Sequence, residues 1–464
     1  MRIIKLFKNH ILALVTAVVL IIISCNADLT LPAYMSEIVD VGIQQGGIES
    51  PVPDTIRRSS LDDLEMFMSE EDASIVEAAY SSPDEQGICT YQGTEADRED
   101  DGAVAQAMSL PETVALALAQ GVDASHLDNA GSGQGSLSMD DVRAAFAAGM
   151  LSRDQLVEGA QAMADSMGEM GGSIVRQRAI GYVQQEYEAQ GISLADVQNS
   201  YLAGMTAKMF GLCAISLVAT ILTGAVASHT ACTIARDLRR KTFHKVMSFS
   251  AAEVGKFSQA SLITRCTNDI QQIQMASTLL IRMVLMAPIM GTVALVRVFA
   301  TKTGLEWTIG VAVIAVSAVV GVLMGLTMPK FKKMQQYIDR VNLVAREILD
   351  GLMPIRAFGR QEHELKRFDK ASTDLMDTQL FTNRAMSFMM PLMMLVMNCI
   401  MVLIVWTGSH GVNDGIMQVG DMMAFMSYTM QIVMSFMILT MVSVMMPRAE
   451  VACERVEEVL ATES

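Results

Sequence analysis

The sequence predicts an all-α membrane protein with six long transmembrane helices, cytoplasmic helical extensions and a mostly helical extracytoplasmic insert between the first two helices. Three observations support this fold class. The 464 residues are 51% hydrophobic with a mean hydropathy of +0.35, which is more apolar than an ordinary soluble domain. Long apolar runs recur along the chain, and Lys and Arg gather in alternate connections between them. Most acidic residues gather in one segment after the first run.

Six apolar runs account for the predicted spans. A helix that crosses about 30 Å of hydrocarbon needs about 20 largely apolar residues. Five runs meet or approach that length, and the first needs its flank, as far as about Tyr34, to cross the bilayer. The six runs are Ile11–Ser24, Met209–Ala227, Leu279–Ala300, Trp307–Met328, Phe388–Trp406 and Met422–Met446.

The basic residues orient these spans. Lys and Arg precede the first run, follow the second and lie between the fourth and fifth, whereas the connections after runs three and five carry almost none. Cytoplasmic connections are enriched in Lys and Arg, so six spans with both termini in the cytoplasm satisfy every connection. One alternative stays open. The basic start, the apolar core and Ile22–Cys25 also resemble a lipoprotein signal peptide, whose cleavage would leave five spans.

The segment Val41–Met205 is strongly acidic and is predicted to lie outside the cytoplasm. It carries 28 Asp and Glu, seven Arg and no Lys, a net charge of −21 in a chain whose total is −16. Short helices are expected in it, and two stretches rich in Gly, Ser and Asp, Ser81–Asp101 and Gly121–Gly135, are predicted to be mobile. The predicted helix starts resemble capping boxes and lie at Ser60–Asp63, Ser138–Asp141 and Ser193–Asp196.

Several roles are open to this insert. It could be a lid, a module that docks a partner, or a weak sink for divalent cations. No spacing of its carboxylates matches a Ca²⁺ loop, so the simplest alternative is a solvated acidic surface without a ligand. The seven cysteines do not form a disulfide framework, because only Cys89 lies in the insert; we expect the cysteines to be small buried hydrophobes.

The two long cytoplasmic connections are predicted to be helical hairpins. Apolar residues recur at helical steps in the strip Ala260–Gln274, where Leu262, Cys266, Ile270 and Ile273 should face inward. Because a helix rises 1.5 Å per residue, about 20–25 residues would carry each tip roughly 30–35 Å from the membrane.

Each hairpin has a predicted break at its tip. The breaks lie at Phe249–Ser258 and Asp350–Gly359. In the strip after the first break, Arg265, Asn268 and Asp269 are expected on or near the wetter side, where they can cap, pair or brace the turn.

Three stretches of this sequence resemble ABC exporter half-transporters. "FHKVMSFSAAEVGKFSQASLITRCTNDIQQIQ" is similar to the first intracellular region of that family, and "REILDGLMPIRAFGRQEHELKRFDKA" to the second. "RAEVACERVEEVLATES" resembles the stretch where those proteins leave the sixth span for a nucleotide-binding domain. The resemblance covers roughly residues 1–45 and 200–464. It implies two coupling helices, near Ala251–Lys256 and Met353–Phe358, that dock on nucleotide-binding domains.

The resemblance also implies partners and domains. ATP and Mg²⁺ would be bound by a partner nucleotide-binding domain, this chain would hold no cofactor, and a second half-transporter, identical or different, would pair with it. The expected coupling residues are Glu253, Val254, Gly255, Ile355, Arg356 and Phe358. The expected domains are residues 1–40 (first helix), 41–204 (acidic insert), 205–447 (helices two to six) and 448–464 (linker).

A phosphate-binding loop is missing from the sequence. The string closest to G-x-x-x-x-G-K-[ST] is "SAAEVGKF", in which Ser250 replaces a glycine and Phe257 replaces the hydroxyl that holds Mg²⁺. The chain therefore has no predicted ATPase site of its own. Either a separate polypeptide supplies the ATPase, or the open reading frame is truncated.

Methionine stripes mark one face of spans five and six. Three interpretations are open: pliable helix packing, a deformable cavity wall that accepts varied apolar substrates, and handling of Cu(I) by thioethers. The third lacks a nearby Cys or His pair, and the family resemblance adds weight to the second. The candidate cavity residues are Met397, Met430, Met434, Met437 and Met441.

The sequence thus predicts the transmembrane part of an ATP-driven exporter in the plasma membrane. It would move a small molecule, lipid or peptide out of the cytoplasm by alternating access, as part of an ATP-hydrolysing translocase, with no nucleic-acid partner. The alternative is a membrane-anchored scaffold that displays the insert to an external partner. Two docking breaks argue against the scaffold, since it has no need of them.

Overall fold

The chain folds almost entirely into helices, as predicted. The computed structural model describes residues 7–98, 102–120, 139–166, 171–301, 303–413 and 416–462. It divides into two compact units, which are described separately. Unit 1 comprises Met1–Cys25, Ala219–Val405 and Tyr428–Ser464, and unit 2 comprises Asn26–Val218 and Trp406–Ser427. The four-part domain division remains a prediction.

Long helices contain all six apolar runs. They are α2 (Ile11–Glu37), α10 (Leu194–Met247), α14 (Met286–Thr301) with the segments before it, α15 (Glu306–Asp350), α18 (Met389–Asn413) and α19 (Val419–Ala461). The segments before α14 are α12 (Gln259–Thr264), η4 (Arg265–Asp269), α13 (Ile270–Leu279) and η5 (Leu280–Val284), of which η4 and η5 are π-helical turns. A 3₁₀ turn, η1 (Phe7–His10), precedes α2, and a π-helical turn, η2 (Ile38–Gln44), follows it.

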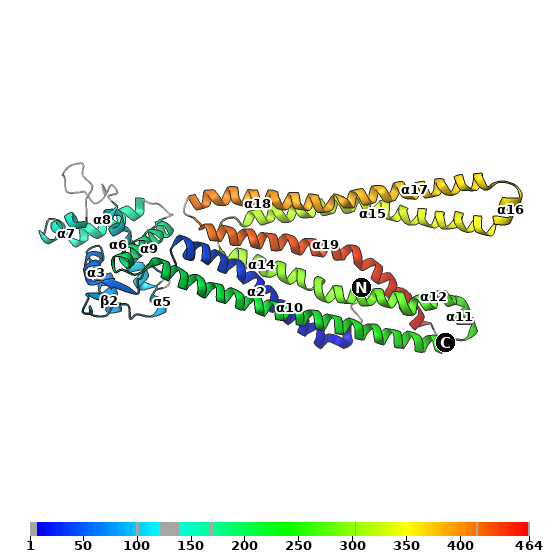
Figure 1. The fold of residues 1–464 in the computed structure, drawn as a ribbon, viewed down its shortest axis with the longest axis horizontal. Coiled ribbons are helices and arrows are strands. Elements are labelled where there is room, and N and C mark those ends of the chain that lie inside the picture. The colour runs from blue at the N-terminus through cyan, green and yellow to red at the C-terminus, as the bar shows by residue number, and fades with distance from the viewer. Residues whose placement is uncertain are drawn as a thin grey trace. The chain divides into compact units, whose positions relative to one another are not determined.

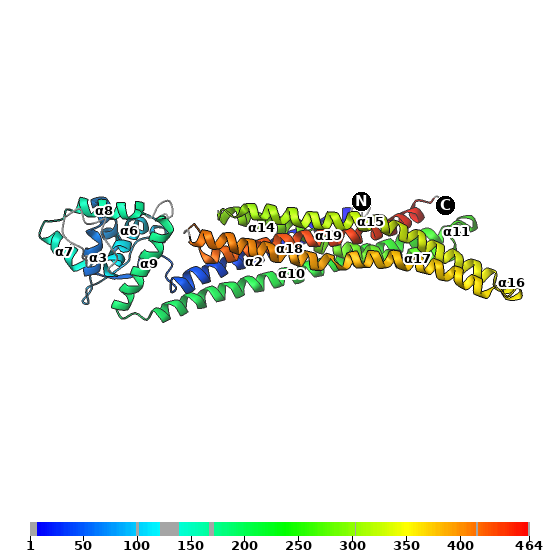
Figure 2. The same cartoon turned by 90° about the horizontal axis from the view of Figure 1, so that it is seen from above.

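Two hairpins extend beyond the apolar runs in unit 1. In one, α15 and α17 (Gln361–Ser387) lie side by side and are joined at the tip by the short helix α16 (Leu352–Ala357) (Figures 1 and 2). In the other, α10 leads through the short helix α11 (Ala251–Phe257) into α12. Both predicted breaks are therefore present, and each contains a short helix. Buried Leu238, Ile270 and Ile273 lie in the core of this unit.

A seventh helix is also apolar enough to cross a membrane by length and composition. This candidate contains α6 (Ala103–Ala119). Protein buries 72% of its apolar window, against 11–39% for the other six. Helix α6 therefore belongs to the core of the insert, which keeps the predicted number of spans at six.

The insert in unit 2 is a small helical fold with one two-stranded sheet. Strands β1 (Thr55–Arg57) and β2 (Ile88–Thr90) are antiparallel, with Ile56 opposite Cys89. Helices α6 and α9 contact each other, and α6 contributes twelve buried residues. The insert helices, besides α6, are α3 (Arg58–Glu65), α4 (Glu70–Ala79), α5 (Glu95–Arg98), α7 (Met139–Ala147), α8 (Arg153–Ser166) and α9 (Gly171–Ala189).

Two predictions for the insert are wrong. In the predicted mobile stretch Ser81–Asp101, the described residues 81–98 contain β2 and α5, because Cys89 pairs into the sheet and is buried. Ser60 does not cap a helix, since α3 already begins at Arg58 and the Ser60 hydroxyl is buried. The second predicted mobile stretch, Gly121–Gly135, lies outside the described residues.

Of the other two predicted helix starts, one is confirmed and one lies outside the described residues. The Ser193 hydroxyl accepts a hydrogen bond from the Asp196 backbone N–H at 3.4 Å, and α10 begins at Leu194, as predicted. Ser138 lies outside the described residues, although α7 begins immediately after it, at Met139.

A buried charge cluster joins β1 to α9 in the insert. The Glu186 carboxylate accepts hydrogen bonds from the Arg57 guanidinium (2.9 Å), the Ser60 hydroxyl (2.9 Å) and the Gln190 amide (2.9 Å). Burial raises the pKa of Glu186, but these hydrogen bonds outweigh burial, so the pKa is lowered overall. Glu112 of α6 is fully buried nearby, and neither of its carboxyl oxygens has a hydrogen-bond partner among the described residues. Burial, and then the charge of Glu186, raise the pKa of Glu112 well above its usual value.

The two ends of the insert meet. The Gln198 side-chain amide of α10 donates a hydrogen bond to the Gly42 carbonyl of η2 at 2.7 Å. At Gly47, φ is +85° and an added Cβ would lie 2.8 Å from the Gln198 Cα, so only glycine fits there. The chain therefore enters and leaves the insert at neighbouring points.

A second contact in unit 2 joins the end of the first span to the start of the last. The buried Asp40 carboxylate accepts a hydrogen bond from the Gly420 backbone N–H at 2.8 Å, in the first turn of α19. A Cβ at Gly420 would lie 2.3 Å from the other Asp40 oxygen. This fit explains why a residue without a side chain occupies position 420.

Candidate functional site

The first candidate site is the tip formed by α11. Its N-terminus is held by Glu253, whose carboxylate accepts a hydrogen bond from the Ser250 backbone N–H at 2.5 Å. Hydrogen bonding to Ser250 lowers the pKa of Glu253, so the residue is a charged cap. Ser250–Phe257 is thus a capped helix and not a glycine-rich turn, and it does not fit the cradle that a nucleotide phosphate requires.

A small apolar core fixes the orientation of α11. Phe257 is buried and stacks on Phe249, with ring centroids 6.1 Å apart and nearly parallel planes. Val254 and Leu262 pack in the same cluster as Val459, near the end of α19. Gly255 is exposed, and a Cβ added there would meet nothing within 4 Å. The exposed side of α11 is therefore open for contact with another molecule.

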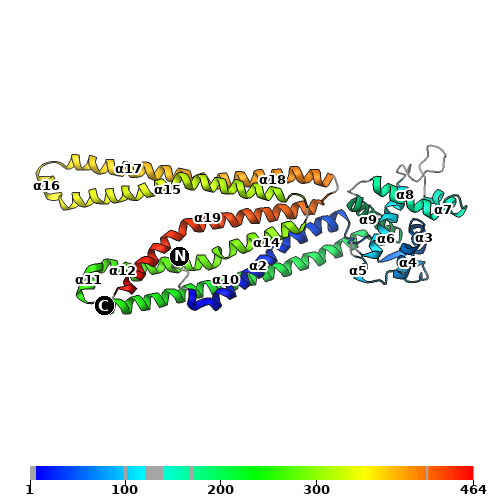
Figure 3. The same cartoon turned by 180° about the vertical axis from the view of Figure 1, so that it is seen from behind.

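Arg265 ties this tip to the end of α19, whose ribbon lies beside α12 in Figure 3. Its guanidinium donates hydrogen bonds to the Arg455 carbonyl at 2.9 Å and to the Glu458 carboxylate at 2.8 Å. It also lies 4.8 Å from the Phe257 ring centroid, a cation–π distance. The prediction of a brace at Arg265 is confirmed, but Asp269 was wrongly placed on the wetter side. The π-helical turn η4 rotates Asp269 into a buried position, 4.0 Å from Arg455.

The second candidate site is the tip formed by α16. Ile355 is half-buried and Arg356 is exposed, while the apolar side chains of Met353 and Phe358 are 77% and 81% exposed. Gly359 ends the turn with φ +62°, a conformation that favours glycine. Below the tip, Arg367 of α17 forms an ion pair with Glu347 of α15, which holds the two legs together. Large apolar side chains this exposed make the tip a candidate contact surface.

The methionine face lies on α18 and α19. Met430, Met434 and Met441 are exposed, and Met397 and Met437 are half-buried. Phe436 and Leu439 are also exposed on α19, but at other positions around the helix. Lipid or another protein chain can cover such a face, and a cavity wall within a paired transporter would also have this character.

Comparison with known families resolves the class of this chain. The family described as "ABC transporter transmembrane region" matches residues 165–436, which is more than half of the chain. The chain belongs to the ABC transporter transmembrane-region family. The predicted fold class and family are thus confirmed, and the chain is a multi-pass membrane protein.

Several curated proteins are similar to this ABC transmembrane chain. An uncharacterized ABC transporter ATP-binding protein of Mycobacterium tuberculosis is 32% identical over 60% of this chain and 48% of its own length. The uncharacterized ABC transporter ATP-binding protein YfiB of Bacillus subtilis is 32% identical over 59% of this chain and 47% of its own. An ATP-dependent lipid A-core flippase of Pseudomonas fluorescens is 26% identical over 42% of this chain and 32% of its own. The chain spans about half the length of the first two relatives.

The family match bears on the two tips formed by α11 and α16. They are the places where the sequence resemblance puts coupling helices, and short helices are present at both. The individual coupling roles of Glu253, Val254, Gly255, Ile355, Arg356 and Phe358, and the cavity role of the methionines, remain predictions. Among the described residues, no three His, Cys, Asp or Glu side chains cluster as a metal site would require.

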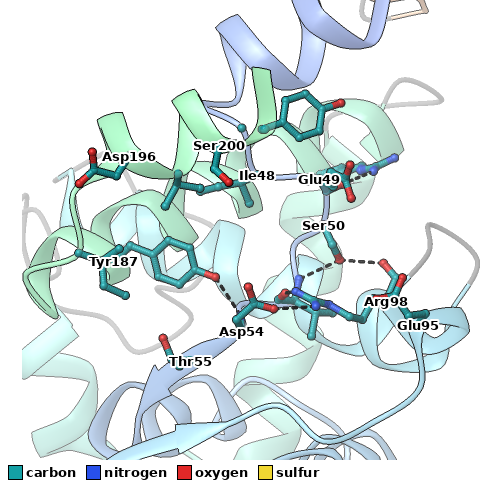
Figure 4. Close-up of a pocket in the computed structure, with 16 residues that line it drawn as sticks. Ile48, Glu49, Ser50, Asp54, Thr55, Glu95, Arg98, Tyr187, Asp196 and Ser200 are labelled. Carbon is teal, nitrogen blue, oxygen red and sulfur yellow. Dashed lines mark hydrogen bonds and ion pairs between the residues drawn. The ribbon is translucent and has the colours of Figure 1, made fainter. Parts of the chain in front are cut away.

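A cavity of about 1060 Å³ lies in the insert, where the sequence predicted no site (Figure 4). Arg98 is one of the lining residues. Its guanidinium forms an ion pair with Asp54 at 2.7 Å and donates a hydrogen bond to the Val52 carbonyl at 2.9 Å. The Tyr187 hydroxyl accepts a hydrogen bond from the Asp54 backbone N–H. The lining comes from positions 47 to 201, which the fold brings together, so no local sequence signal could have revealed it.

Proposed function

We propose that this chain is the transmembrane part of an ATP-driven exporter. It would move a small molecule, lipid or peptide out of the cytoplasm by alternating access, in a pair with a second transmembrane chain. ATP and Mg²⁺ would bind to a nucleotide-binding domain that docks on α11 and α16. The ATP-binding names of the longer relatives support this assignment.

The observation that carries the proposal is the pair of exposed tips. Each is a short helix at the end of two long helices, and each presents residues with no packing role of their own, such as Gly255 at one tip and Phe358 at the other. A protein that served only as a membrane anchor would gain nothing from two such rigid projections. A transporter needs them, because closure of an ATPase must be transmitted to the spans.

A purification from native membranes tests the proposal. The tagged full chain should bring down a nucleotide-binding protein, or carry such a domain covalently, and the sample should hydrolyse ATP. Arg356→Glu combined with Phe358→Ala should abolish that association while leaving the chain in the membrane. A sample without ATPase and without any nucleotide-binding partner would contradict the proposal.

The cavity in the insert favours a second candidate function. In this alternative the spans anchor the insert, which binds an external partner through the surface around Arg98 and Tyr187. The same purification discriminates, because a captured external protein that requires the insert, without ATPase, would support the anchor.

A further inference from the structure

A dense basic surface lies on α10 where the apolar part of that helix ends. Within ten residues, Arg236 to Lys245, the helix carries five Lys or Arg and a single acid, Asp237, which pairs with Arg236 at 2.8 Å. Arg240, Lys241 and His244 are exposed. The family's docking tips do not account for this surface, because it lies on the long helix before α11.

The basic side chains line an open hollow between α10 and the end of α19. A cavity of about 950 Å³ is lined by Arg236, Arg240, Lys241 and Lys245, with Leu460 of α19 among the lining residues. Asp237 is the only carboxylate among the lining residues, all of which lie in the described part of the chain. Four cations and an apolar side chain therefore converge on one space.

The position of the hollow along α10 indicates what can reach it. No Asp, Glu, Lys or Arg occurs in the 27 residues from Met209 to Ala235, which lie between Lys208 and Arg236. At 1.5 Å per residue this stretch is about 40 Å long, the thickness of a bilayer with its headgroups. Arg236 therefore lies at headgroup level, and Arg240 and Lys241 lie about 6–8 Å further along the helix. The basic residues also place this end on the cytoplasmic side.

We propose that this hollow, defined by Arg236, Arg240, Lys241 and Lys245, binds the phosphate headgroup of an anionic phospholipid from the cytoplasmic leaflet. Guanidinium and ammonium groups donate charge-assisted hydrogen bonds to phosphate oxygens, and a basic pocket beside a span at the cytoplasmic surface suits an anionic headgroup. Lipid binding at this site does not require ATP coupling, so the experiment below tests it independently of the proposed function.

Native mass spectrometry of the purified full chain in detergent tests this site. Phosphatidylglycerol and phosphatidylcholine with the same acyl chains are titrated separately. Arg240→Gln combined with Lys241→Gln should lower retention of phosphatidylglycerol about tenfold or more, because each basic residue near the surface contributes appreciably to anionic-lipid binding. Retention of phosphatidylcholine should not change.

Two further variants distinguish lipid binding at this site from a general effect of positive charge on the protein. Arg360→Gln with Lys370→Gln removes the same charge from exposed positions on the α15–α17 hairpin, far from the bilayer, and should retain phosphatidylglycerol. Arg240→Lys with Lys241→Arg keeps the charge and should restore binding. Equal lipid retention in wild type and the double Gln variant would overturn the proposal. Displacement of phosphatidylglycerol by inorganic phosphate at comparable concentration would also overturn it, in favour of a soluble phosphate site.

Discussion

The Arg265 guanidinium lies 2.8 Å from the Glu458 carboxylate, although 193 positions separate the two residues in the chain. This ion pair joins the tip that contains α11 to the last turns of α19. In an exporter, both elements would move together when the ATPase closes. The Arg265 side chain is 13% exposed and the Glu458 side chain is 51% exposed, so water screens the pair mainly from the Glu458 side.

Arg265→Ala should loosen the end of α19. We expect the backbone amides of Val456 to Ala461 to exchange hydrogen about 5–30 times faster, which corresponds to a loss of about 1–2 kcal/mol. Hydrogen–deuterium exchange of the full chain measures this. Arg239→Ala, at an exposed position on α10, is the control and should leave exchange unchanged. Unaltered exchange in Arg265→Ala would show that the pair does not hold the helix.

Glu253 caps α11, and an experiment must distinguish this role from the proposed role of its charge in coupling to the ATPase. Glu253→Ala removes the acceptor of the Ser250 N–H and should fray α11, whereas Glu253→Gln keeps an acceptor without the charge. In an assembled, reconstituted transporter we expect both variants to lower substrate-stimulated ATPase severalfold if the charge contacts the partner. Normal coupling in Glu253→Gln together with a defect in Glu253→Ala would limit the residue to capping.

The methionine face should influence which substrates are moved. Replacing Met430, Met434 and Met437 with Leu keeps the volume but reduces the pliability of the face. Transport assays over apolar substrates of differing shape should show an altered range. Met247→Leu with Met376→Leu, at exposed positions of α10 and α17 outside the two methionine stripes, is the control. An unchanged range in the triple variant would mean that these side chains only pack.

The Arg57–Glu186 cluster predicts acid sensitivity of the insert. Because the pKa of Glu186 is lowered in the folded state, the cluster stabilises the fold above the usual glutamate pKa of about 4.5, and this stabilisation is lost as the pH falls through the lowered value. The protection factors of the α9 amides, which correct for slower intrinsic exchange in acid, should fall below about pH 4.5. Glu186→Gln should weaken this pH dependence, and Glu188→Gln, at an exposed position on the same helix, should preserve it.

Glu112 has the opposite pH dependence. Its pKa is raised in the folded state, so its contribution is most favourable below the usual glutamate value and is lost as the pH rises. Glu112→Leu should stabilise the insert at pH 8 by about 1–3 kcal/mol, since it removes a buried group without a hydrogen-bond partner. Urea unfolding followed by exchange at α6 measures this. Destabilisation at pH 8 would indicate that the carboxyl has a partner such as a bound water.

Local signals predicted the spans and both tips, because apolar runs and helical steps act over short distances. The features that were missed depend on distant residues. Strand β1 is recognisable only beside β2, and Ser60 faces Glu186 across the fold rather than its own helix end. The extra residue in the turn η4, which buries Asp269, changes the helical phase without a sequence signal. The cavity beside Arg98 likewise requires the assembled insert.

The hydrogen bond between Gln198 and Gly42 closes the neck of the insert, and this closure bears on how such a chain could have arisen. The chain enters and leaves the folded insert at two adjacent points. For the helices before and after the insert, the insert therefore constrains the chain as a short loop would. The entropy of closing a loop grows only with the logarithm of its length, so gain or loss of about 150 residues here changes the bundle's stability little. A membrane bundle with such a neck can exchange one inserted domain for another while its own helices stay unchanged.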